Sequence, residues 1–323
     1  MKHLMAIIAT FILAVGLLAG CSGQQQPAKS QQLILATGGV GGTYHPYGIA
    51  LANLFNGKIA NINVIPQNTG ASIENLRLVN KKDAELAIVQ NDMLDYAYGG
   101  REMFKDRLPN IRAIATLYPE VIQIVVRADS DINTFGDIKG KKFGVGPPGS
   151  GTEVNFRQLL DSSGFDYKAL APAYVSFAQG ADQFKAKLID GFIVTAGTPN
   201  PAIANLGAGA DPAIRIIGLP EGMIARLTQK YSFLTPYTIQ PNTYRGQTEP
   251  VKTLAVQATL ITNSEVSDDV IYIITKTLFE SRGELAQTND KGKELSLETA
   301  LAGISVPLHP GAAKYYREKG LIK

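Results

Sequence analysis

The folded part of the chain opens with the segment Leu33-Ile34-Leu35-Ala36-Thr37-Gly38-Gly39-Val40-Gly41-Gly42-Thr43-Tyr44. Its apolar start predicts a short strand, and its glycine-rich continuation predicts a loop. Pro46 follows at a position where proline is tolerated in the first turn of a helix, and Asn56-Gly57 provides a stop signal for that helix. The segment therefore predicts a strand, a glycine loop and a helix in succession.

The same succession recurs further along the chain. A strand is expected over residues 61–66, and Asn68-Thr69-Gly70-Ala71-Ser72 opens the next helix. A strand over 85–90 precedes a helix over 91–98, and a strand over 142–145 precedes the loop 146–152 and another helix. A further strand is expected over 188–194, leading into residues 195–199. Alternating strands and helices predict parallel sheet, and hence an α/β fold class.

Two β-rich runs cover residues 111–117 and 121–127, and the second suggests a crossing from one lobe into another. The apolar run over 254–262 suggests the return of the chain to the first lobe. We expect residues 33–122 and 253–323 to form one lobe and residues 123–252 to form the other. About 290 residues are enough for two lobes of ordinary size.

The N-terminus has the character of a secretory signal. Lys2 is followed by the almost wholly apolar run Leu4–Leu18, which is too short for a comfortable membrane span. The run ends in Leu18-Ala19-Gly20-Cys21, which resembles the processing site of bacterial lipoproteins. That resemblance implies a signal peptide over 1–20, cleavage before Cys21 and acylation of its sulfur. The alternative is an ordinary secretory signal with an incidental cysteine.

Residues 21–32 are rich in Gln, contain two Ser, one Lys and one Pro, and predict a flexible tether. Cys21 is the only cysteine, so an internal disulfide cannot form. Its acylation would place the protein outside the cytoplasm on a membrane lipid anchor. The formal net charge of +3 gives no indication of nucleic-acid binding.

Three loops predict a site for an anion. They are Gly38–Tyr44, Asn68–Ser72 and Gly149–Glu153, and each leads from a strand into a helix. Helix N-termini expose unpaired amides and the positive end of the helix dipole, and small residues let an anion approach. Ser150 with Glu153 also fits a capping box, so the third loop has a purely structural interpretation. Together the loops favour a carboxylate or phosphate site at the carboxyl ends of strands.

Several enzyme motifs are excluded by single residues. Gly146 and Gly151 have P-loop spacing, but Thr152 stands where lysine is required. Tyr44 occupies the place of the third glycine of a dinucleotide fingerprint. His45 and His309 are the histidines beyond the leader, which is a weak basis for a metal site, and no nucleophile elbow is present. We therefore predict no catalytic residue, no metal and no cofactor.

Six segments together resemble the TAXI family, the solute-binding subunits of TRAP (tripartite ATP-independent periplasmic) transporters. They are Thr37-Gly38-Gly39, Gly41-Gly42-Thr43-Tyr44, Thr69-Gly70-Ala71-Ser72, Ala87-Ile88-Val89-Gln90, Val145 to Glu153, and Pro307-Leu308-His309-Pro310-Gly311-Ala312. The resemblance implies a type II periplasmic-binding-protein fold, in which hinge strands join two α/β lobes that close on the ligand. It also implies a multi-span TRAP permease as partner, and glutamate, glutamine or a dicarboxylate such as 2-oxoglutarate as the solute. We expect a monomer.

The resemblance further implies which residues contact the solute. These are Gly42, Thr43, Tyr44, Thr69, Ala71, Ser72, Gln90, Ser150, Gly151 and Thr152, with Gly197 and Thr198 on the far wall. The ring of Tyr44 would pack on the ligand, or else in the core, and its hydroxyl would bond a polar part of the ligand. Two alternatives remain: a sensor that serves a membrane receptor, and a secreted enzyme of the same two-lobed shape.

Overall fold

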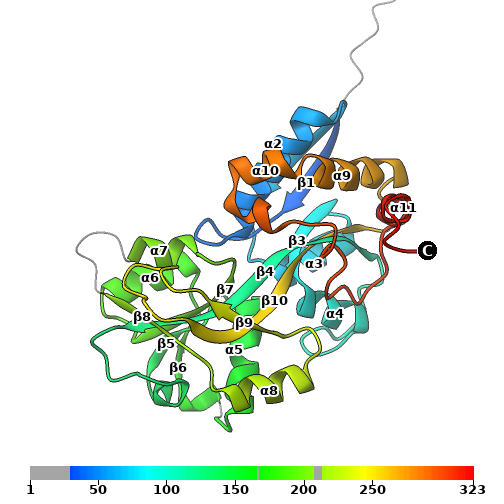
Figure 1. Ribbon diagram of the computed structural model, residues 1–323. Helices are drawn as coiled ribbons and strands as arrows, with labels where there is room; N and C mark the ends of the chain where they lie inside the picture. The colour runs from blue at the N-terminus through cyan, green and yellow to red at the C-terminus, as the bar shows by residue number, and fades with distance from the viewer. Residues whose placement is uncertain (1–29, 166, 207–212) are drawn as a thin grey trace, which may run out of the picture.

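The computed structural model describes residues 30–165, 167–206 and 213–323. In this part of the chain, two lobes of strands and helices share one ten-stranded sheet (Figure 1). The strand order is β2-β1-β3-β10-β4-β7-β5-β6, with β8 beside β4 and β9 beside β10. The strands are β1 (Gln31–Ala36), β2 (Ile62–Gln67), β3 (Leu86–Gln90), β4 (Ile111–Arg127), β5 (Lys142–Gly144), β6 (Ala171–Ala173), β7 (Gly191–Ala196), β8 (Ile214–Ile217), β9 (Thr235–Ile239) and β10 (Val251–Asn263).

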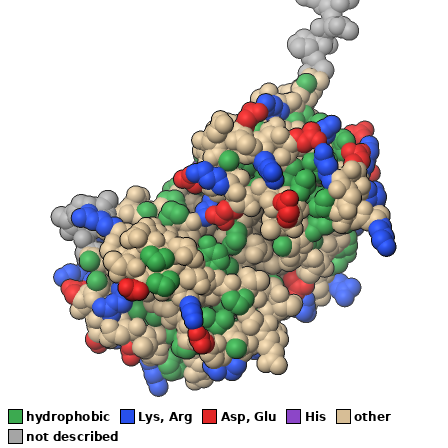
Figure 2. All heavy atoms as spheres, viewed as in Figure 1, with side chains coloured by type: hydrophobic (Ala, Val, Ile, Leu, Met, Phe, Trp, Pro, Cys, Tyr) green, Lys and Arg blue, Asp and Glu red, His purple; other side chains and the backbone are tan. Residues whose placement is uncertain are grey.

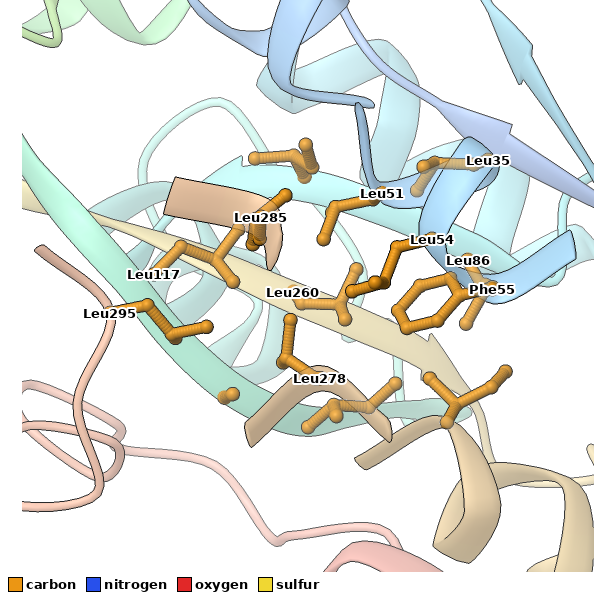
Figure 3. Close-up of a cluster of buried hydrophobic side chains, with 14 of the residues drawn as sticks. Leu35, Leu51, Leu54, Phe55, Leu86, Leu117, Leu260, Leu278, Leu285 and Leu295 are labelled. Carbon is orange, nitrogen blue, oxygen red and sulfur yellow. The ribbon is translucent and has the colours of Figure 1, made fainter. Parts of the chain in front are cut away.

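In the first lobe, β1, β2 and β3 are parallel, and each is followed by a helix. Along β3, Leu86 and Ile88 belong to one core cluster while Ala87 and Val89 belong to another, because successive strand residues point to opposite faces. The first cluster packs under helices that include α2, α9 and α10, and Figure 3 shows its leucines meeting Phe55. The helices of this lobe are α2 (Tyr44–Lys58), α3 (Ser72–Lys81), α4 (Asn91–Gly99), α9 (Asp268–Glu280), α10 (Arg282–Thr288) and α11 (Pro310–Glu318), with the 3₁₀ turn η3 (Asp290–Glu294).

The second lobe has the same layered arrangement. Ile122 and Ile124 pack with α5 and α8 on one face, whereas Val121 and Val125 pack with α6 and α7 on the other. Strands β5 and β6 are parallel to each other, and β5 is parallel to β7. The helices are α5 (Gly151–Ser162), α6 (Phe177–Lys185), α7 (Pro201–Leu206) and α8 (Glu221–Lys230), with 3₁₀ turns η1 (Phe135–Ile138) and η2 (Tyr167–Ala169).

Two long antiparallel strands, β4 and β10, run from one lobe into the other (Figure 1). The sequence predicted two β-rich runs at 111–117 and 121–127, but the structure has one strand that continues through Pro119. The pairing of β4 with β7 begins only at Val121, so Pro119 has no strand on that side to which an N–H would donate. The lobe boundaries at 122/123 and 252/253 stay a prediction.

The described residues extend the fold slightly beyond its predicted start. β1 begins at Gln31, because the backbone of Gln31 and Gln32 pairs with β2 although both side chains are exposed. The end of the predicted tether, residues 31–32, therefore belongs to the sheet. The signal peptide over 1–20 and Cys21 lie outside the described residues. In the described part, no helix has the length and apolar character needed to cross a bilayer.

Candidate ligand cavity

A cavity of about 430 Å³ lies where the two lobes meet. Its walls come from the loops that follow β1, β2, β5 and β6, from the ends of β3 and β7, and from the middle of β4. This is the expected position for a ligand in α/β sheets, and the volume suits a small metabolite. The lining residues are Gly38, Gly39, Val40, Gly41, Gly42, Thr43, Tyr44, Asn68, Thr69, Gly70, Ala71, Ser72, Gln90, Glu120, Pro147, Ser150, Gly151, Thr152, Ser176, Phe177, Ala178, Thr195 and Ala196.

The structure brings most of the predicted contact residues together around this cavity. Gly42, Thr43, Tyr44, Thr69, Ala71, Ser72, Gln90, Ser150, Gly151 and Thr152 all line it. That they contact a solute stays a prediction. The lining also includes a segment that the sequence analysis missed, Ser176 to Ala178 at the start of α6.

Gly197 and Thr198 are the exceptions, and they do not line the cavity. The sequence predicted that this strand ends at residue 194, but β7 continues to Ala196. Thr195 and Ala196 therefore occupy the wall, and the two predicted residues lie beyond it. They contact Lys291 instead, whose Nζ donates to the Thr198 carbonyl oxygen at 2.5 Å. A Cβ on Gly197 would come within 2.9 Å of Lys291 Cε and 3.0 Å of Thr43 Cγ2, so a larger residue there would require these side chains to shift.

Helices α2, α3, α5 and α6 begin at the cavity, and they differ in how their first turns are capped. Ser176 caps α6, because its side chain accepts a hydrogen bond from the Gln179 amide. Ser150 caps α5, because its Oγ accepts a hydrogen bond from the Glu153 amide at 3.2 Å. The starts of α2 and α3, at Thr43 and Ala71, have no side-chain cap. Uncapped first-turn amides lack a partner within their helix, which leaves them available to a negatively charged group. Ala71 also has a φ of 73°, a strained value for a residue with a side chain.

Several of the predicted hydroxyls already serve the protein itself. Thr69 donates to the Thr37 carbonyl oxygen at 3.0 Å, and Ser72 accepts from the Gln90 amide at 3.1 Å. Thr152 is 3% exposed, and its Oγ1 accepts from the Thr195 amide at 3.3 Å. The Thr152 hydroxyl therefore joins α5 to β7, and one of its two lone pairs is already used.

Other polar atoms on the cavity wall have no partner. Thr43 Oγ1, Gln90 Oε1 and Thr195 Oγ1 are buried and make no hydrogen bond within the described part of the chain. Buried polar atoms are normally paired, and leaving one unpaired costs about 1–3 kcal/mol. Each of these atoms is closed off from water as well, so its side chain has to turn toward the cavity before it can bond a solute.

One acidic side chain lines the cavity. Glu120, on β4, is 2% exposed, and its Oε1 accepts a hydrogen bond from the Tyr44 hydroxyl at 2.5 Å. Burial raises the pKa of Glu120 well above its usual range, and the nearby Asp92 carboxyl adds to the rise. The sequence analysis found no role for Glu120. Its position as a lone acid within apolar β-rich sequence was the available signal.

The lobes also contact each other beside the cavity through buried polar side chains. Gln90 Nε2 donates to Asn155 Oδ1 at 3.3 Å, and Asn155 Nδ2 donates to Asp92 Oδ2 at 2.7 Å. Gln158 Nε2 donates to the Tyr96 hydroxyl at 3.1 Å. We call these five residues the interlobe network. Burial raises the pKa of Asp92 to about 7.

The described residues contain no cluster of His, Cys, Asp and Glu that could hold a metal ion. The cavity-lining residues among them include no Lys, Arg or His. Any attraction for an anion therefore has to come from backbone amides, hydroxyls and side-chain amides.

Known structures share this architecture at low sequence identity. The periplasmic aliphatic sulphonate binding protein SsuA of Escherichia coli has a TM-score of 0.51 and 15% identity, covering 90% of this chain and 84% of that chain. A putative L-cystine ABC transporter structure from Listeria monocytogenes has a TM-score of 0.51 and 13% identity, covering 84% and 98%. A structure described with glutathione import via GshT and the cystine ABC importer TcyBC of Streptococcus mutans has a TM-score of 0.52 and 14% identity, covering 81% and 94%.

These likenesses confirm the predicted two-lobed periplasmic-binding-protein fold. The family is shown by a separate comparison, since the family model matches residues 35–320, which include nearly all of both lobes. By that match, the chain belongs to the NMT1-like family.

Proposed function

We propose that this chain is an extracytoplasmic solute-binding protein that captures glutamate, glutamine or a related dicarboxylate such as 2-oxoglutarate. The observation that carries the proposal is the meeting of four helix starts, those of α2, α3, α5 and α6, in one cavity between the lobes. Helix N-termini favour a carboxylate. Three lining residues also have a buried polar atom without a partner in the described part of the chain, and these side chains would turn toward a polar solute.

Capture would proceed by closure of the lobes over the solute. Contacts across the cavity mouth favour the closed arrangement when a ligand bridges both lobes. The interlobe network and the bond from Lys291 to Thr198 lie beside the cavity and would form as the lobes approach. β4 and β10, which pass between the lobes, are suited to act as the hinge.

Native mass spectrometry of the purified protein tests the proposal directly. A co-purified species with the mass of one of the named solutes, returned unchanged, is the expected result. Titration calorimetry should then give binding of that solute with a stoichiometry of one. Turnover of the solute by the purified protein, or no binding of any of the three, would contradict the proposal.

We further propose that the protein is anchored by Cys21 and delivers its solute to a TRAP-type permease. Support comes from the lipoprotein-like sequence around Cys21 and from the resemblance of the loop segments to TAXI proteins. An ABC importer is the second candidate, because the Listeria and Streptococcus structures are described with ABC transport. Membrane vesicles separate the two candidates: uptake driven by an ion gradient without ATP favours a TRAP permease, whereas an ATP requirement favours an ABC importer.

A further inference from the structure

The described ionisable side chains that line the cavity are acidic only. Glu120 is the one carboxyl among the described lining residues, and none of the others is Lys, Arg or His. Glu120 pairs with Val256 in the β4–β10 ladder, so its backbone is held by both lobe-crossing strands. The helix starts at Thr43 and Ala71 contribute partial positive charge from the loops. The cavity therefore has positive loop regions and a single acidic group on its β4 wall.

Resting on the proposed function, we infer that Glu120 binds a positively charged ammonium group of the solute, so that the protein selects an amino acid over the corresponding 2-oxo acid. A carboxylate of the amino acid would lie at the helix starts. Its ammonium group would lie at Glu120, whose Oε1 is fixed by Tyr44. An amino acid such as glutamate or glutamine carries both groups, whereas 2-oxoglutarate lacks the cation.

The groups around Glu120 make its ionised form unfavourable unless a cation lies beside it. Tyr44 donates a hydrogen bond to the carboxyl. The nearby Gln90 side chain lowers the pKa of Glu120, whereas the negative charge of Asp92 raises it. Burial raises the pKa of the Tyr118 hydroxyl, and the charge of the Glu120 carboxylate raises it further. With no cation beside it, burial raises the pKa of Glu120 and favours the protonated form of the carboxyl. An ammonium group at hydrogen-bond distance stabilises the carboxylate, so binding an amino acid should release that proton.

A purely structural Glu120, present only to hold Tyr44, predicts something different. The carboxyl would then stay protonated whether or not a solute is bound. Binding would release no proton, and amino acids and 2-oxo acids would differ only through shape. Proton release on binding therefore shows whether Glu120 binds the ammonium group of the solute or only holds Tyr44.

Titration calorimetry of the wild-type protein in two buffers with different ionisation enthalpies measures this release. We expect L-glutamate or L-glutamine to bind at least tenfold more tightly than 2-oxoglutarate. Binding of the amino acid should release up to one proton, and binding of 2-oxoglutarate should release none. A tightly bound amino acid that releases no proton near neutral pH would overturn the inference. So would tighter binding of 2-oxoglutarate, although solute capture itself would then stand.

The variant Glu120→Gln keeps the shape of the side chain and removes its charge. We expect amino-acid affinity to fall at least tenfold and 2-oxoglutarate affinity to be unchanged. Glu153→Gln is the matched control, because Glu153 is also buried, at 4% exposure, but lies outside the cavity lining. Equal loss for both solute classes in Glu120→Gln would overturn the inference. If that variant fails to fold, the wild-type proton release decides. Binding of none of the three solutes would remove the proposed solute class and the role of Glu120 with it.

Discussion

At Gly151, the substitution Gly151→Ala adds one methyl group, which should weaken solute binding without lowering the free energy of unfolding. Gly151 is the first residue of α5, and an ideal Cβ built there would lie 1.5 Å from Gln90 Oε1 and 2.4 Å from Gln90 Cδ. An ordinary contact between such atoms is about 3.5 Å, so the Gln90 amide has to move by about 2 Å in Gly151→Ala. Gln90 is 2% exposed and lines the cavity, so the space open to the displaced amide is the cavity itself.

The expected cost is concentrated in ligand binding. Displacing Gln90 breaks its bond to Asn155, which contributes about 1 kcal/mol, whereas alanine in place of glycine in a helix gains at most about 1 kcal/mol. The free energy of unfolding should therefore change little. An amide that protrudes into the cavity should weaken solute affinity at least tenfold, or about 1.4 kcal/mol. Calorimetric titration with L-glutamate and thermal melting measure the two quantities separately.

Gly39→Ala is the matched control, because Gly39 also lines the cavity but a Cβ there meets nothing within 4 Å. Its affinity should stay within about threefold of wild type. A double-mutant cycle adds a sharper test: in a Gln90→Ala background, Gly151→Ala should have little further effect. Wild-type affinity in Gly151→Ala would refute the reasoning. An equal loss in Gly39→Ala would assign the effect to general crowding instead.

Three further predictions concern other parts of the chain. Thr152→Val leaves the Thr195 amide without its acceptor, so urea unfolding should show a loss of about 1–3 kcal/mol, which Thr152→Ser should restore; equal stability of the two variants would contradict the role of the hydroxyl. Burial raises the pKa of Asp92 to about 7, against about 4 in an unfolded chain, so its stabilising contribution is present below pH 4 and is lost as pH rises through 7. The free energy of unfolding of wild type relative to Asp92→Asn should therefore fall by about 2–3 kcal/mol between pH 5 and pH 8, and a flat difference would refute this. Cys21→Ser should release the protein from membranes in a fractionation experiment, and a variant that stays membrane-bound would exclude the lipid anchor.

The sequence predicted the parts of the fold that depend on local pattern. Glycine loops, helix starts and apolar strands over residues 33–98 agree with β1 to α4 to within a few residues. The end of β7 was placed two residues early because Thr195 and Ala196 follow the apolar run without being strongly apolar themselves. Their burial comes from pairing with Ile122 and Val121 on β4, which no local pattern reveals.

The candidate site was predictable where it is built from loops and hidden where it depends on distant partners. Ser176 and Gln179 form a complete capping box at the start of α6, and that spacing was readable in the sequence. Glu120 was not readable in the same way. Its bond to Tyr44 joins residues 76 positions apart, so its place on the cavity wall emerges only when the sheet is assembled.

The path of the chain through β4 and β10 has an evolutionary consequence. The chain enters the second lobe along β4 and returns along β10, and both described ends of the chain lie in the first lobe (Figure 1). The second lobe thus lies between β4 and β10 in the chain, and these two strands are its connections to the first lobe. Figure 2 shows basic and acidic side chains interspersed over the displayed face of both lobes, so exchange of a lobe would join surfaces of mixed charge. Chimeras that combine the second lobe of one relative with the first lobe of another should retain the pairing of β4 with β10. New solute preferences can arise by such recombination.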